Sequence, residues 1–64
     1  MNVYIEYYPN PFDLDEYIVK MIRDVEKIRY CKIGEKPVVE FRKDGETTFG
    51  PWAYTIKKLE VTNE

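Results

Sequence analysis

The sequence predicts an α+β fold of two layers, in which one helix packs on a small, mostly antiparallel sheet in the order β-α-β-β-β. Three observations predict it: an alternating segment at residues 2–8, helix-capping residues followed by apolar residues at helical spacing, and an Asp-Gly turn between two further alternating segments. The 64 residues predict one domain, 1–64, whose core is small because so short a chain buries only about 60% of its unfolded surface.

The first predicted element is a strand. Residues 2–8, NVYIEYY, are aromatic and β-branched, and their alternation places Val3 and Ile5 on one face. Pro9 and Pro11 lack backbone donors for a strand ladder, so they end this strand.

A helix is predicted from about Leu14 to about Tyr30. Asp13 is a favourable N-cap, and Glu16 three residues later completes a capping box. Phe12 before the cap and Tyr17 after it are placed to form a hydrophobic staple. The predicted core face of this helix consists of apolar residues spaced by three and four: Leu14, Ile18, Met21, Val25 and Ile28.

The other faces of the predicted helix carry two possible contact surfaces. A basic ridge on the side opposite the core contains Lys20, Arg23 and Lys27, one turn apart. A flank of mixed acidic and apolar character lies between ridge and core and contains Asp15, Val19, Ile22 and Glu26.

The second half of the chain predicts a hairpin and a final element. Strands are expected at 37–43 and 46–49 around Asp44-Gly45, since both turn residues tolerate the positive φ of a type I′ turn. Residues 52–61 favour a strand that needs a bulge near 57–58, because their apolar residues change phase there. A helix remains the alternative, since apolar residues also recur there at helical spacing after a proline.

The residue inventory argues against an enzyme and a cofactor. The chain has no His and no Ser, and its single cysteine, Cys31, has no imidazole partner to activate it. One cysteine also excludes an intramolecular disulfide and the usual zinc ligand sets. We therefore expect a non-enzymatic, cofactor-free protein, supported by self-association as a homodimer.

Charge is unevenly placed along the chain, although the formal net charge is only −2. Residues 1–19 contain four carboxylates and no basic side chain, whereas residues 20–43 contain eight basic and four acidic residues. This distribution suits electrostatically guided binding, and solubility alone explains it equally well.

Six tyrosines and one tryptophan favour a protein-binding module, because these residue types dominate interface hot spots. A basic partner would suit the acidic and aromatic surface, which could also imitate the phosphates of DNA. The predicted partner-binding residues are Glu6, Tyr8, Asp13, Asp15, Glu16, Val19 and Glu26. A structural alternative is that the tyrosines merely cover an open sheet face.

The second hypothesis is nucleic-acid binding through the basic ridge of Lys20, Arg23 and Lys27. The acidic balance of the whole chain, with a pI near 5.1, argues against it.

In length, charge, tyrosine content and the segment YYPNPFDLDEY, the chain resembles the small early proteins with which bacteriophages take over a host. This resemblance implies an inhibitor or modulator of a host protein, acting in the host cytoplasm. The sequence shows neither a signal-peptide pattern nor an apolar run of about 20 residues, so we expect a cytoplasmic protein without a membrane span.

Overall fold

The computed structural model describes residues 1–63 and shows an almost entirely β fold, so the predicted α+β class is wrong. Within these residues the helical structure is limited to one 3-10 turn. The elements, in chain order, are β1 (Asn2–Tyr7), β2 (Ile18–Ile22), β3 (Lys27–Ile33), β4 (Lys36–Lys43), β5 (Glu46–Trp52), η1 (Ala53–Thr55) and β6 (Ile56–Thr62).

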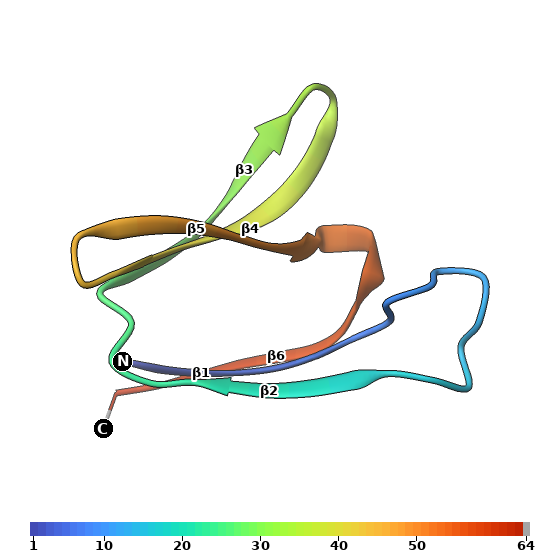
Figure 1. Cartoon of the computed structure of the whole chain (residues 1–64), viewed down its shortest axis with the longest axis horizontal. Coiled ribbons are helices and arrows are strands. Elements are labelled where there is room, and N and C mark those ends of the chain that lie inside the picture. The colour runs from blue at the N-terminus through green and yellow to red at the C-terminus, as the bar shows by residue number, and fades with distance from the viewer. Residues whose placement is uncertain (64) are drawn as a thin grey trace.

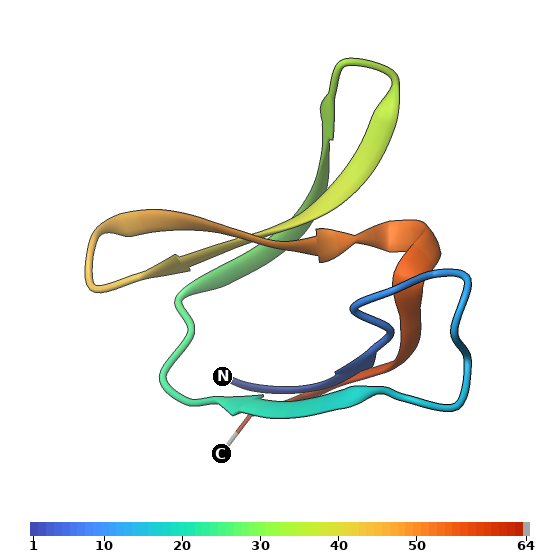
Figure 2. The same cartoon turned by 45° about the vertical axis from the view of Figure 1, so that its right-hand side comes forward.

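The strands form two antiparallel sheets of three strands each, which face one another (Figure 1). The first sheet has the order β2-β1-β6, and the second has the order β3-β4-β5. Figure 2 shows the same two layers and the turn between β3 and β4 projecting away from the first sheet. The loop at 8–17 and η1 lie at one end of the molecule, and the turn between β4 and β5 lies at the other.

The core lies between the sheets and is small, as the chain length predicts. Its buried cluster consists of Val3, Val25, Val39 and Phe41. Gly50 on β5 is required beside it, because a Cβ atom there would lie 2.6 Å from Cε2 of Phe41. The ladder between β4 and β5 is irregular at this position, which allows β5 to pass closely over the Phe41 ring.

The predicted helix at 14–30 is wrong, because this segment forms β2, a corner and most of β3. Five of the eleven residues at 18–28 are β-branched, which favours strands over helices. Pairing of β2 along β1 then decides the conformation. Two members of the predicted core face, Leu14 and Met21, are exposed.

The predicted capping box is replaced by turns within the loop at 8–17. The Asp13 carboxylate accepts a hydrogen bond from the backbone N–H of Asp15 at 3.1 Å, which is the alternative use of an Asp side chain in an Asx turn. No helix follows, and the staple is also wrong, since Phe12 is 96% exposed.

Several local predictions are confirmed. Strand β1 matches the alternating N-terminal segment, and the hairpin turns at Asp44 and Gly45, with φ of 54° and 77°. Strand β6 confirms the strand interpretation for residues 56–61, whereas Trp52 ends β5 and Ala53–Thr55 form η1. The bulge of β6 is at the predicted place, because Glu6 pairs with Lys58 whereas the next residue pairs with Ile56.

A corner at residues 23–26 carries the chain from the first sheet to the second. Asp24 adopts φ of 59°, a left-handed conformation in which Asp is tolerated. The backbone N–H of Val25 donates to the carbonyl of Met1 in the first layer at 2.7 Å. The N–H of Glu26 donates to the carbonyl of Arg42 in the second layer at 2.8 Å. These bonds hold the layers together at the end opposite η1.

Candidate functional site

An open groove of about 330 Å³ lies where the end of β1 and the following loop meet the end of β5 and η1. Aromatic and proline side chains dominate its lining, which consists of Tyr7, Tyr8, Pro9, Pro11, Pro51, Trp52, Tyr54 and Thr55. Such a groove offers flat apolar surfaces together with the hydroxyl groups of tyrosine as hydrogen-bond partners.

One backbone and one side-chain hydrogen bond fix the two walls of this groove. The N–H of Tyr8 donates to the carbonyl of Thr55 at 2.9 Å, which ties the start of the loop to η1. The buried hydroxyl of Thr55 donates to the carbonyl of Trp52 at 2.8 Å and holds η1 itself. The aromatic rings are therefore attached to a rigid frame, while Tyr54 projects with 58% of its surface exposed.

The loop at 8–17 borders the groove and exposes large apolar side chains. Asn10 organises the start of the loop through two hydrogen bonds. The side-chain oxygen of Asn10 accepts one from the N–H of Phe12 at 3.0 Å, and its backbone carbonyl accepts one from the N–H of Asp13 at 3.1 Å. Phe12 and Leu14 are exposed, whereas the ring of Tyr17 lies under the ammonium group of Lys57, 3.6 Å from the ring centroid. Exposed apolar groups in such a setting are typical of an interaction surface.

The same loop carries three carboxylates and no basic residue. Asp15 and Glu16 are exposed, and Asp13 is half-buried. Within residues 1–63, none of the three lies within 4.0 Å of a Lys or Arg nitrogen. These charges are therefore available to a positively charged partner.

The structure places four of the predicted partner-binding residues together at this groove or loop: Tyr8, Asp13, Asp15 and Glu16. Glu6 and Val19 instead lie opposite one another on the outer face of the first sheet. Glu6 accepts a hydrogen bond from the hydroxyl of Tyr4 and pairs with Lys57 at 3.6 Å. The Tyr4 hydrogen bond is the main cause that lowers the pKa of the Glu6 carboxyl.

Glu26 lies at the far end of the molecule from the loop. Its carboxylate accepts the N–H of Gly45 at 3.2 Å and pairs with Arg42 at 3.8 Å. It therefore belongs to the end with the β4–β5 turn and not to the groove.

Sequence reasoning did not identify Pro51, Trp52 and Tyr54 as site residues. The available signal was the segment GPWAY, whose proline and aromatic residues match those of the loop. The local pattern of this segment indicates only the start of a strand or helix, whereas the groove depends on contact between Tyr8 and Thr55, which are far apart in the sequence.

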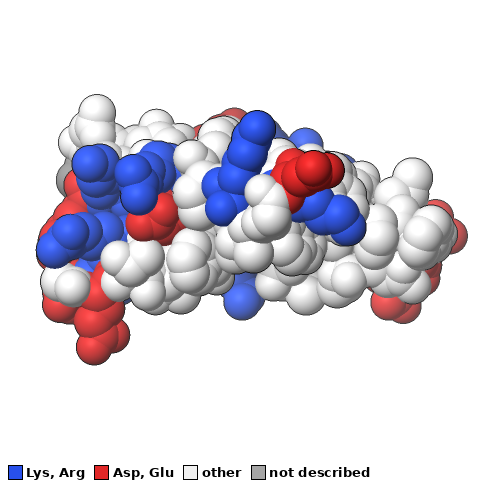
Figure 3. Space-filling view, turned by 90° about the horizontal axis from the view of Figure 1, so that it is seen from above, with Lys and Arg blue, Asp and Glu red and all other residues white. Residues whose placement is uncertain are grey.

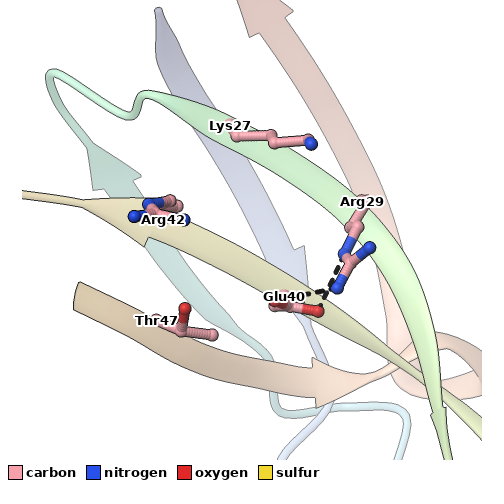
Figure 4. A pocket seen from close by; sticks show the side chains of 5 residues that line it. All are labelled: Lys27, Arg29, Glu40, Arg42 and Thr47. Carbon is pink, nitrogen blue, oxygen red and sulfur yellow. Dashed lines mark hydrogen bonds and ion pairs between the residues drawn. The ribbon is translucent and has the colours of Figure 1, made fainter. Parts of the chain in front are cut away.

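The predicted basic helix ridge is not formed, because no helix spans its residues. Lys20 lies on β2 with its ammonium group 5.8 Å from the ring centroid of Tyr7, and Arg23 lies in the corner. Lys27 lies on β3 and lines a separate basic groove of about 110 Å³ on the outer face of the second sheet (Figure 4).

The chemistry of Cys31 does not favour a nucleophile. Burial and the neighbouring Glu40 raise the pKa of its thiol, so the protonated form is favoured at neutral pH. Among residues 1–63, no three His, Cys, Asp or Glu side chains gather as a metal site. No helix in that part of the chain has the length and apolarity to cross a membrane.

Comparisons with protein-family models, with curated proteins and with solved structures found no match.

Proposed function

We propose that the protein is a binding module that takes an extended, proline-containing and basic segment of a partner protein into the aromatic groove. The observation that carries this proposal is the position of the groove beside the loop at 8–17, whose three carboxylates have no basic neighbour within the loop.

The shape and chemistry of the groove support an extended ligand. Polyproline II segments bind in aromatic-lined grooves because their conformation is preformed, so they lose little entropy on binding. Their carbonyl groups remain free to accept hydrogen bonds, which Tyr8 and Tyr54 could donate. The prolines at 9, 11 and 51 add rigid apolar walls.

The acidic loop supports a basic flank in the ligand. Asp15 and Glu16 stand exposed next to the groove, so arginine or lysine residues at one end of the ligand would meet them. This agrees with the basic partner expected from the sequence. We do not extend the proposal to DNA mimicry, because Glu6 and Glu26 lie outside the loop and are already paired.

A peptide titration followed by NMR tests the proposal. The probe is a peptide of about ten residues with prolines at every third position and two arginines at one end. We expect the signals of Tyr8, Trp52 and Tyr54 to shift with this peptide. A peptide with glutamates in place of the arginines should bind more weakly, and so should one with glycines in place of the prolines.

Two tyrosines provide a matched pair of variants for this titration. Tyr54 on η1 is 58% exposed in the groove, whereas Tyr30 on β3 is 59% exposed and does not line the groove. We expect Tyr54→Ala to weaken binding by about 30-fold, the effect of losing an interface hot spot, and Tyr30→Ala to leave it unchanged. Equal affinities for both variants, or no binding by the wild type, would disprove the proposed function.

A further inference from the structure

The outer face of the second sheet carries a basic groove that the proposed protein-binding function does not use (Figure 4). Its lining comes from three neighbouring strands and consists of Lys27, Arg29, Glu40, Arg42 and Thr47. The strand register explains why they meet, because Lys27 pairs with Arg42 and Arg42 pairs with Thr47 on adjacent strands. Residues paired in this way direct their side chains to the same face.

The single carboxylate of this groove is already occupied. Arg29 donates two hydrogen bonds to Glu40, from Nε at 3.0 Å and from Nη2 at 3.4 Å. Within residues 1–63, Lys27 has no carboxylate within 4.0 Å. Arg42 has only Glu26, at 3.8 Å, and the side chains of Arg42 and Glu26 are both more than half exposed. Lys27 and Arg42 are therefore available to bind an anion.

The wider surroundings of the groove are also basic. Residues 27–43, which include β3 and β4, contain six basic and two acidic residues, a net charge of +4. Seen from the side of the second sheet, Lys and Arg side chains gather in two groups on the molecular surface (Figure 3). The overall acidity of the chain therefore does not describe this face.

An exposed aromatic residue, Phe49, lies on β5 two positions after Thr47, which lines the groove. Phe49 pairs with Glu40 across β4 and β5, so it shares the face of the groove, and 54% of its surface is exposed. Cations that contact a phosphate backbone, next to an aromatic ring on which a base stacks, are the combination that proteins use to bind single strands. A duplex keeps its bases stacked internally and would leave the ring unused.

We propose that this face binds single-stranded nucleic acid, with Lys27 and Arg42 at the phosphates and Phe49 stacked on a base. This surface differs from the ridge predicted from the sequence and shares only Lys27 with it. It is also separate from the aromatic groove, so either site can fail without the other.

Fluorescence anisotropy with a labelled oligo(dT) of about 12 nucleotides tests this proposal at ~50 mM salt. We expect Lys27→Gln combined with Arg42→Gln to weaken binding by at least about tenfold. The slope of log K against log salt should decrease in magnitude by about 1.4, because two phosphate contacts are lost. The matched control is Lys57→Gln with Lys58→Gln on β6, which removes the same charge from the other sheet and should bind as the wild type does.

A second arm tests stacking. Phe49→Leu should weaken the oligo(dT) complex while leaving the weaker binding of a duplex of the same length unchanged. Circular dichroism and urea unfolding establish that each variant is folded. The proposal is overturned if the control pair weakens binding as much as the Lys27 and Arg42 pair does. It is also overturned if the duplex or a polyglutamate of equal charge binds as tightly as oligo(dT), because the face would then be a general anion-binding surface.

Discussion

The aromatic groove and the basic face have no lining residue in common, and they differ in both charge and construction. The groove is built from a loop and a 3-10 turn, and its loop carries three acidic residues and no basic one. The basic face is built on three paired strands. Two of them, β3 and β4, lie within residues 27–43, which carry a net charge of +4, so the rest of the chain carries −6.

This contrast shows why the whole-chain charge is a poor guide to partners for this protein. A net charge of −2 is the balance of two strongly charged regions of opposite sign. Electrostatic attraction acts over about 10 Å at ordinary salt, so a partner responds to the nearer region and not to the sum. One domain can thus present a surface for a basic peptide and another for a polyanion.

The largest expected effect comes from a core substitution that impairs binding at both surfaces. Phe41→Ala empties a buried position in the core between the sheets and should lower the free energy of unfolding by about 3–5 kcal/mol. A domain of this size has little stability to spare, so both peptide and oligonucleotide binding should fall. Urea unfolding followed by the fluorescence of Trp52 measures the change.

Phe49→Ala is the control for that core substitution, since this phenylalanine is exposed. Phe49→Ala should lower the free energy of unfolding by less than about 1 kcal/mol and should weaken only oligonucleotide binding. A stability loss as small for Phe41→Ala as for Phe49→Ala would show that the two sheets do not share the described core.

A smaller effect separates the two surfaces. Asp15→Asn with Glu16→Gln removes two exposed loop carboxylates that make no ion pair among the described residues. We expect about fivefold weaker binding of the arginine-flanked peptide at low salt, the scale of about 1 kcal/mol for exposed charge pairs. Isothermal titration calorimetry at two salt concentrations measures it.

The matched control for the loop pair is Glu35→Gln with Glu46→Gln, which removes the same charge from two other exposed turns or strand ends. Peptide affinity should be unchanged in this variant. If both double variants bind the peptide equally weakly, the loop has no special role and the attraction depends on the total charge of the protein.

The sequence predicted those features that depend on neighbouring residues. The turn at Asp44 and Gly45 needs positive φ, which these two residue types supply wherever they occur. The bulge in β6 followed from a change of phase within a few residues, and it lies where Lys57 is left without a partner on β1. In both cases the physical cause is contained in the segment itself.

The helix prediction failed because residues 18–28 satisfy two periods at once. Ile18, Ile22 and Val25 recur at helical spacing, yet Ile18 and Ile22 also lie on one face of a strand. The decision depends on pairing with β1, a contact between distant parts of the chain. The capping residue Asp13 was ambiguous for the same reason, because an Asx turn and a helix N-cap use the same carboxylate.

The site predictions divide along the same line. Tyr8 and the loop carboxylates were identified because they are close in sequence. Tyr54 was missed because it meets Tyr8 only in the folded chain. The hydrogen bond between Tyr8 and Thr55 brings together two segments that are far apart in the sequence. Lys27 was assigned to the wrong neighbours, since its partner across the ladder is Arg42.

The smallest expected effect concerns the one carboxylate of the basic face. Hydrogen bonds from Arg29 are the main cause that lowers the pKa of Glu40, partly opposed by desolvation. A carboxyl whose pKa is lower in the folded state stabilises the fold above its unfolded pKa of about 4.5 and loses that contribution as the pH falls through its folded pKa. We therefore expect Glu40→Gln to lose less stability than the wild type between about pH 6 and about pH 3.

Urea midpoints across this pH range measure the difference between Glu40→Gln and the wild type. Glu35→Gln is the control, because Glu35 is exposed and has no ion pair among the described residues, and it should keep the wild-type pH dependence. Glu6, whose carboxyl pKa is also lowered, remains in all three proteins, so some acid destabilisation persists in each. If Glu40→Gln follows the wild-type curve throughout, its pairing with Arg29 does not stabilise the sheet, and Arg29 would then be free to act as a third cation of the basic face.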